Sequence, residues 1–205
     1  MDTLRYQKKD LDQVVDALNH GKVIAFPTDT VFGLGVRYDD ETALNRLKQA
    51  KIRPDSKPIP MMVASFEQVK MVAEVSTKAE RLMKAFMPGA FTIVLKKKSN
   101  VADYITNGRA TIAIRMPADD FVLSLMTKMN CALLVSSANI SSQHSCQSAS
   151  EVLEQLNGRI DGIVLGESGN GVASTIVDAS MDTFHILREG PISKEMIEEV
   201  WEERL

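Results

Sequence analysis

The sequence predicts an α/β domain with a mixed β-sheet. Short apolar segments that favour β-structure alternate with amphipathic segments of about 8 to 11 residues at helical spacing, a pattern typical of helices packed on a sheet. Loops that contain Gly171 and Gly190 join the last strands without an intervening helix, which favours a mixed sheet. With 44% apolar and 25% charged residues, the 205-residue chain has the composition of a globular protein with a sizeable core.

The spacing of apolar residues and the positions of turn-forming residues predict the elements near the N-terminus. Apolar residues at helical spacing predict a helix over residues 11–18, and residues 19–21 end it. Residues 22–26 are a short β-prone run closed by Pro27, so a strand is expected there. The threonines, aspartate and glycines of residues 28–35 predict a functional turn.

The next elements follow from the same criteria. A helix over residues 43–50 has an apolar stripe, either Asp40 or Thr42 can cap it, and Pro54 and Pro58 end the helical pattern. Beyond it, the sequence predicts a strand at 59–64, helices at 66–73 and 77–86, and a strand at 91–95.

The second half of the chain continues the alternation. Polar and apolar residues alternate over residues 111–115 and predict a strand. The remaining predicted elements are a helix at 121–129, a strand at 133–135 leading into polar residues 136–139, a helix at 150–156, a strand at 162–165, a glycine-rich loop at 166–171, strands at 175–177 and 185–187, and a helix at 192–201.

The chain shows neither an internal repeat nor a low-complexity linker, so one domain is expected over residues 1–205. No apolar run approaches the roughly 20 residues that span a bilayer. Residues 1–10 are polar and have neither signal-peptide nor lipidation features. We therefore expect a cytoplasmic protein without a membrane partner.

Charge and composition narrow the function classes. The 24 Lys and Arg residues against 27 Asp and Glu residues give a net charge of −3, which disfavours a strongly basic nucleic-acid-binding domain. Basic residues are nevertheless clustered between Arg46 and Lys57 and at residues 96–98, so a local anion site stays open. The two cysteines and three histidines show no ligand spacing, so neither a disulfide scaffold nor a protein-held transition metal is expected.

Polar segments at strand ends carry the candidate chemistry, because open α/β sheets bind ligands there and no familiar nucleotide-binding, hydrolase or zinc motif is present. Residues 27–35 combine hydroxyls, a carboxylate and two glycines, although an ordinary turn has the same composition. Lys51 and Arg53, with Lys57 nearby, predict either an anion clamp or a solvated surface.

Three further polar segments and the single residue Arg115 have both a ligand-binding and a structural interpretation. Residues 136–139 follow a buried strand, so their hydroxyl and amide groups need partners, which a turn or a ligand could supply. Residues 174–178 and Arg188 could be plain strand ends, and Arg115 could be a simple edge cation.

Six of these segments in order resemble the YrdC-like family of threonylcarbamoyl-AMP synthases, over nearly the whole chain. They are residues 27–35, Lys51-x-Arg53-Pro54, Thr111-x-x-x-Arg115, Ser137-x-Asn139, residues 174–178 and Arg188-x-Gly190. The resemblance implies a twisted mixed sheet with flanking helices and a large concave basic cavity. It also implies a single-domain member without the second domain that longer members append.

The resemblance implies a nucleotidyltransferase that condenses L-threonine, bicarbonate and ATP to threonylcarbamoyl-AMP and pyrophosphate, for threonylcarbamoyladenosine modification of tRNA. Its implied catalytic residues are Lys51, Arg53, Ser137 and Asn139. The implied threonine-binding residues are Thr30, Arg115 and Ser174. The implied ATP-binding residues are Arg53, Lys57, Thr111, Ser137, Ser145 and Arg188. Magnesium is expected to arrive with ATP.

The sequence departs from the family pattern at four places. Phe32 stands where tyrosine is common, Lys57 where asparagine is common, and Met62 where some relatives have a histidine that contacts threonine. Residues 141–148 lack the proline-containing run of many relatives, which bears on the assignment of Ser145.

Two other functions remain open from the sequence. A non-catalytic module could bind tRNA or double-stranded RNA, although the net charge of −3 and 5% aromatic residues offer little for this. A paralogue of the family could hydrolyse a preformed adenylate. If the chain is a synthase, a threonylcarbamoyl transferase is the expected downstream partner, because an acyl-adenylate hydrolyses readily in water.

Overall fold

The computed structural model describes residues 2–169 and 171–202, which form a mixed α/β fold around one sheet. Its strands are β1 (Leu4–Tyr6), β2 (Ile24–Phe26), β3 (Gly33–Arg37), β4 (Met61–Met62), β5 (Phe91–Lys96), β6 (Thr111–Arg115), β7 (Leu133–Ser137), β8 (Gly162–Val164), β9 (Thr175–Asp178) and β10 (His185–Arg188). Parallel and antiparallel neighbours occur together, in the order β1-β8-β2-β3-β7-β4-β6-β5-β9-β10. This confirms the predicted mixed sheet.

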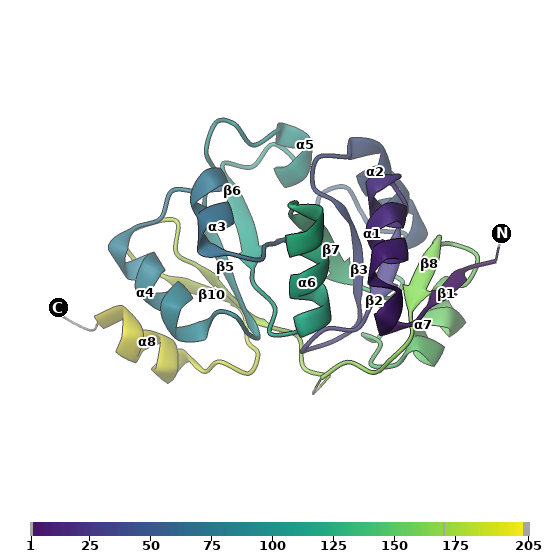
Figure 1. The fold of residues 1–205 in the computed structure, drawn as a ribbon. Coiled ribbons are helices and arrows are strands. Elements are labelled where there is room, and N and C mark those ends of the chain that lie inside the picture. Colours follow the sequence, from purple (N-terminus) through teal and green to yellow (C-terminus); the bar gives the residue numbers. More distant parts are fainter. Residues whose placement is uncertain (1, 170, 203–205) are drawn as a thin grey trace.

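The helices flank a large twisted sheet (Figure 1). They are α1 (Leu11–Asn19), α2 (Glu41–Ala50), α3 (Phe66–Val72), α4 (Thr77–Phe86), α5 (Asp103–Thr106), α6 (Asp120–Met129), α7 (Ala149–Leu156) and α8 (Lys194–Glu202), with a short 3-10 helix at Lys8–Asp10. Asp40, and not Thr42, caps α2, because its Oδ1 accepts from the Ala43 amide at 2.8 Å. Across residues 2–169 and 171–202, none of the helices is both long and apolar enough to cross a membrane.

The core fills both faces of the sheet. Along β2, Ile24 and Phe26 pack in one buried cluster, while Ala25 between them packs in the other. Helices α1 and α6 contribute to the first cluster through residues such as Leu18 and Leu125. Because side chains alternate across a strand, helices on each face bury a different set of strand residues.

The predicted turn over residues 28–35 is partly wrong, because Gly33 and Gly35 belong to β3, antiparallel to β2. A Cβ at Gly35 would lie 2.8 Å from the Phe26 ring, and one at Gly33 would lie 2.9 Å from a Val135 methyl. These glycines therefore admit close packing of neighbouring strands, and the polar turn ends before them.

Other differences concern element ends and strand order. Strand β7 extends to Ser137, so part of the predicted polar segment is strand, and β1, β3 and α5 were not predicted. The loop that contains Gly171 does not join adjacent strands, since β8 pairs with β1 and β2 whereas β9 pairs with β5 and β10. Residue 170 of the predicted loop 166–171 lies outside the described residues, as do residues 1 and 203–205 of the expected domain.

Candidate active site

A cavity of about 360 Å³ lies over the central and C-terminal strands, a volume that suits a small-molecule ligand. Its lining includes side chains from the loop between β2 and β3 and from β5, β6, β7, β9 and β10. Four arginines contribute to the described lining, together with one carboxylate, that of Asp178, and several hydroxyls. The cavity therefore has the donors and cations that an anionic ligand requires.

Most of the predicted site residues converge on this cavity. Those in its lining are Thr30, Arg53, Thr111, Arg115, Ser137, Ser145, Ser174 and Arg188. Three predicted residues, Lys51, Lys57 and Asn139, are not among the lining residues. The segments that carry the site are thus brought together by the fold, although they are spread from residue 30 to residue 188.

Strand β6 places Arg115 in the cavity by its alternation. Ile112 and Ile114 are buried in the core, while Thr111, Ala113 and Arg115 alternate with them and line the cavity, to which Ile112 also contributes. The alternation of apolar and polar residues in the sequence therefore has a structural counterpart: Ile112 and Ile114 pack in the core, and Thr111 and Arg115 are presented to the cavity.

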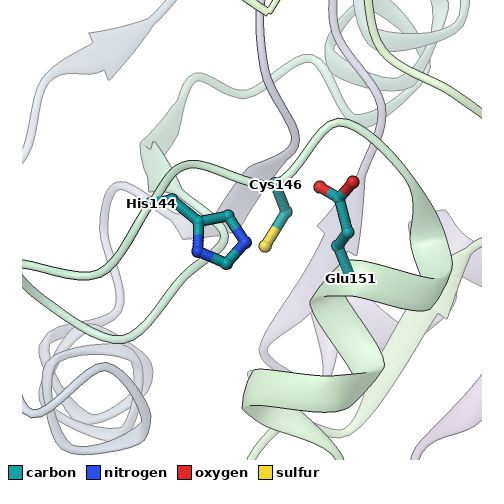
Figure 2. Close-up of side chains that lie close together, drawn as sticks. All are labelled: His144, Cys146 and Glu151. Atoms are coloured by element: carbon teal, nitrogen blue, oxygen red, sulfur yellow. The ribbon is translucent and has the colours of Figure 1, made fainter.

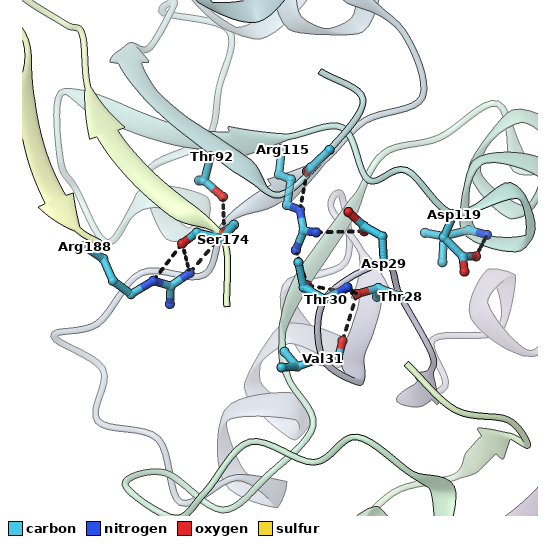
Figure 3. Close-up of polar contacts among 11 residues, drawn as sticks. Thr28, Asp29, Thr30, Val31, Thr92, Arg115, Asp119, Ser174 and Arg188 are labelled. Carbon is cyan, nitrogen blue, oxygen red and sulfur yellow. Dashed lines mark hydrogen bonds and ion pairs between the residues drawn. The ribbon is translucent and has the colours of Figure 1, made fainter. Parts of the chain in front are cut away.

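The Arg115 guanidinium is held by three acceptors (Figure 3). Its Nη1 donates to Thr30 Oγ1 at 2.8 Å, its Nη2 to Asp29 Oδ1 at 2.7 Å, and its Nε to the Gly89 carbonyl at 3.1 Å. Burial lowers the pKa of Arg115, and the Asp29 carboxylate opposes this shift. The cation is therefore fixed in direction and remains charged at neutral pH.

A second cation, Arg188, is anchored on Ser174. Arg188 Nη2 donates to the Ser174 carbonyl at 2.7 Å and to Ser174 Oγ at 3.0 Å. The same hydroxyl lies 2.8 Å from Thr92 Oγ1 (Figure 3). The pKa of Arg188 is lowered by burial and then by the charge of Arg115. An anion placed between the two arginines would relieve this repulsion.

Arg53 reaches the cavity from the segment that follows α2. Its Nη2 donates to the Pro58 carbonyl at 2.9 Å, and its Nε donates to the Lys57 carbonyl at 3.1 Å. Burial lowers the pKa of Arg53. Lys57 thus helps to orient Arg53 through its backbone, while its own side chain is exposed.

Lys51 is buried and is not among the residues that line the cavity, so it is not the solvated surface residue that was the alternative to a clamp. Only 1% of Lys51 is exposed, and its ammonium donates to the backbone carbonyls of Ser137 and Asn139, the latter at 2.6 Å. Burial, followed by the charge of Arg53, lowers the pKa of Lys51 to about 7. Ile52 between them has a φ of 52°, in the left-handed region.

Asn139 has a similar supporting position. Its Nδ2 donates to the carbonyls of Ile140 at 2.8 Å and Gln143 at 2.9 Å, and its buried Oδ1 has no hydrogen-bond partner among the described residues. The Ser141 amide in turn donates to the Lys51 carbonyl at 2.8 Å. Lys51 and Asn139 therefore hold the loop after β7 as a unit.

Sequence reasoning missed several lining residues. Arg109 lines the cavity and donates to the Ser56 carbonyl at 3.1 Å, but it belongs to none of the recognised segments. Thr92 lies inside a predicted apolar strand. A single hydroxyl among apolar neighbours is the signal that could have marked it as a cavity residue. Asp178 lies in a recognised segment, but the sequence did not distinguish it from a strand end.

Cys131 and Cys146 are both buried and are not disulfide-bonded. Burial is the largest cause that raises the pKa of each thiol to about 11. Neither thiol is therefore an activated nucleophile at neutral pH.

The fold and site define an α/β protein with a hydroxyl-rich and arginine-rich cavity at its sheet. The Sua5/YciO/YrdC family model, which carries the description "Telomere recombination", matches residues 16–190. The chain belongs to this family.

Relatives named threonylcarbamoyl-AMP synthase share much of the sequence. The protein from Pyrococcus abyssi is 42% identical over 185 residues, covering 89% of this chain and 54% of the relative. That from Bacillus subtilis is 37% identical over 202 residues, covering 97% and 58%. That from Vibrio vulnificus is 36% identical over 185 residues, covering 88% and 98%. The chain thus spans little more than half the length of the first two relatives.

Solved structures agree in fold. P. abyssi Sua5 complexed with L-threonine matches with a TM-score of 0.90 at 38% identity, covering 97% of this chain and 60% of that one. E. coli YciO matches with a TM-score of 0.82 at 25% identity, covering 93% and 95%. The large twisted sheet with flanking helices is therefore shared with both.

Proposed function

We propose that this chain is a threonylcarbamoyl-AMP synthase domain, which joins L-threonine, bicarbonate and ATP into threonylcarbamoyl-AMP with release of pyrophosphate. The observation that carries the proposal is that Arg115 and Arg188 share one cavity with Arg53, Ser137 and Ser145. Such a cavity has room for an amino acid beside a nucleotide phosphate. The names of the relatives from P. abyssi, B. subtilis and V. vulnificus support it.

Threonine is proposed to bind at the end of β6. The Arg115 guanidinium would receive its carboxylate, and the hydroxyls of Thr30 and Ser174 would fix its polar groups. Met62 lines this part of the cavity and pairs in register with Arg115 across β4 and β6. A thioether is a weak acceptor, so Met62 supplies apolar contact instead of the histidine contact expected from some relatives.

ATP is proposed to bind across the remaining lining, with its phosphates near Arg53 and Arg188 and its polar groups near Thr111, Ser137 and Ser145. Magnesium would enter with the phosphates as part of the substrate. Its oxygen ligands would then come mainly from ATP and water. In the described lining, Asp178 is the carboxylate that could add a ligand.

The proposed chemistry is two nucleophilic steps. Bicarbonate takes up a proton and loses water to give CO₂, and the threonine amine then attacks the CO₂ carbon to form a carbamate, which returns one proton. A carbamate oxygen then attacks the α-phosphorus of ATP, and the bond to the β-phosphate oxygen breaks to release pyrophosphate. The cavity would contribute by holding the reactants together and by balancing phosphate charge with Arg53 and Arg188. Prior activation of bicarbonate by ATP is the other order to be distinguished.

Lys51 and Asn139 have a supporting place in this proposal. Neither is in the cavity lining; Lys51 donates to the Ser137 carbonyl, and the Asn139 side chain holds the loop that follows Ser137. Arg53 and Ser137 are therefore the members of the predicted four that would touch substrate. Lys51 and Asn139 are positioning residues.

The product would need a consumer, because a mixed anhydride of a carbamate and a phosphate reacts with water. A transferase that moves the threonylcarbamoyl group to adenosine in tRNA is the proposed partner, and the cytoplasm is the proposed location. The relatives from P. abyssi and B. subtilis are longer than this chain. We therefore limit the proposal to the synthase reaction and assign no function that would need the rest of those longer relatives.

One assay tests the function. The chain is incubated with labelled L-threonine, bicarbonate, ATP and Mg²⁺, and both labelled adenylate and pyrophosphate are measured, with each substrate omitted in turn. Formation of both products that requires all three substrates is expected. Breakdown of supplied adenylate without synthesis would instead indicate a hydrolase, and RNA binding without either reaction would indicate an RNA-binding module. Either result would overturn the proposal.

A further inference from the structure

Three potential metal-binding side chains lie together in the segment between β7 and the first turn of α7. His144, Cys146 and Glu151 offer ligand atoms that all lie within 4.8 Å of one another. Figure 2 shows Cys146 between the other two side chains. In a tetrahedral zinc site with bonds of about 2.0–2.3 Å, ligand atoms lie roughly 3.3–3.8 Å apart. Side-chain movements of about 1 Å would therefore complete the geometry.

We propose that His144, Cys146 and Glu151 bind a divalent transition-metal ion of the zinc class, with a fourth position left for water or another ligand. The donor set decides the class of ion. Imidazole and thiolate suit zinc and its neighbours, whereas magnesium and calcium prefer oxygen ligands alone. The site is separate from the magnesium that would accompany ATP.

The surrounding contacts hold the three ligands in place. The Cys146 carbonyl accepts from the Phe32 amide at 2.9 Å, which fixes the loop against the start of β3. One Glu151 oxygen accepts from the Gln147 amide at 2.8 Å, and the carboxylate keeps lone pairs that an ion could use. These bonds set the backbone positions of two ligands before any metal binds.

The Gln155 side chain contacts two of the three proposed ligands. Its Nε2 lies 3.4 Å from His144 Nε2 and 3.4 Å from Cys146 Sγ, and its Oε1 accepts from the Ile140 amide at 3.0 Å. Because an amide nitrogen only donates, its bond to Sγ can orient a thiolate ligand, whereas an ion bound at His144 Nε2 would take the place of Gln155 there. Gln155 is therefore a positioning residue for the proposed site.

The location gives the ion a structural consequence. Ser145 lies between two of the ligands and lines the cavity. An ion bound by His144, Cys146 and Glu151 would tie this loop to α7 and hold Ser145 in the cavity wall. Cys146 binds a metal as thiolate, so its proton passes to solvent when the ion enters. Metal binding can be measured without any substrate, so this inference stands or fails independently of the proposed function.

Cobalt provides a spectroscopic test. The purified chain is stripped with a chelator and titrated with Co²⁺, and the thiolate-to-cobalt charge-transfer band and the visible bands of a tetrahedral ion are recorded. One Co²⁺ per chain is expected, displaced by Zn²⁺. Cys146→Ser should lose the charge-transfer band, and Glu151→Gln should weaken binding at least tenfold. Zn²⁺ should raise the melting temperature of the wild type.

Two controls keep the test decisive. Cys131→Ser removes the other buried cysteine and should retain the band. His144→Ala changes an exposed side chain, so it should fold even if Cys146→Ser does not, and it should lose tetrahedral binding. Circular dichroism checks the fold of each variant. The proposal is overturned if the wild type shows no thiolate band, or if the band survives in Cys146→Ser or in His144→Ala.

Discussion

The Nζ atom of Lys51 lies 2.6 Å from the backbone carbonyl oxygen of Asn139, 88 positions further along the chain. The same ammonium donates to the Ser137 carbonyl. One buried side chain thus joins the end of α2 to the end of β7, where a wall of the cavity begins. The first prediction concerns this contact.

The stability of the protein should depend on the protonation of Lys51. Its pKa in the folded state is lowered from 10.5 to about 7, mainly by burial, with Arg53 lowering it further and Cys146 opposing. Between these two values the unfolded chain binds more protons, so the free energy of unfolding should rise with pH, by up to about 1.4 kcal/mol per pH unit from this group. Below about pH 7, Lys51 is protonated in both the folded and the unfolded state, so burial of its charge destabilises the protein to the full extent.

Urea unfolding of the wild type and Lys51→Met between pH 7 and pH 10 measures this effect. The difference in unfolding free energy between the two proteins should change with pH in the stated direction. Parallel pH profiles for the two proteins would show that Lys51 has the same pKa in both folded and unfolded states.

Arg53→Ala should abolish most of the proposed synthesis while leaving the fold intact. Removing a cation that stabilises charge in a transition state commonly lowers kcat by about 100-fold or more. Threonine-dependent and bicarbonate-dependent pyrophosphate release is the measurement. Arg5→Ala, at an exposed position of β1, is the matched control and should keep wild-type activity. Equal activity of both variants would remove Arg53 from the site.

Arg115→Ala should raise the KM for threonine about tenfold or more, equivalent to about 1.4 kcal/mol, with a smaller effect on the KM for ATP. The change also leaves Asp29 without its cation, which should lower stability by several kcal/mol. The double variant Arg115→Met with Asp29→Asn should recover stability but not threonine affinity. An unchanged threonine requirement in the single variant would exclude Arg115 from that role.

Gly35→Ala should destabilise the protein by about 1–3 kcal/mol, because the added methyl group would overlap the Phe26 ring. The urea midpoint measures the loss. In a Phe26→Leu background, Gly35→Ala should lower the free energy of unfolding by less than it does in the wild type, since the leucine side chain leaves room for the methyl group. A wild-type midpoint for Gly35→Ala would contradict the packing role of this glycine.

Elements with a strong local pattern were predictable. The predicted helix at 77–86 and strand at 111–115 coincide with α4 and β6, because an amphipathic period and proline or glycine stops act within one segment. Strand β3 was missed, since its glycines also suit a turn. Their packing partners Phe26 and Val135 are not visible from local spacing.

The site residues also divide into those that a local pattern could place and those that only tertiary contacts place. Thr111 and Arg115 could be placed on one face of a strand from alternation alone. The direction of the Lys51 side chain could not, because it depends on carbonyl groups at Ser137 and Asn139. The sequence also offered no metal spacing for His144, Cys146 and Glu151, since the loop conformation and the start of α7 bring them together.

By itself the sequence determined the types and order of most elements, the polar segments and their resemblance to one family of enzymes. Only the tertiary structure decided that Thr30, Arg115 and Arg188 would share a cavity, and that Lys51 would be buried against the carbonyls of Ser137 and Asn139. Periodicity and turn chemistry act over a few neighbouring residues. The pairing of β5 with β9 and of β3 with β7 joins distant segments, and it is set by burial and strand pairing across the whole sheet.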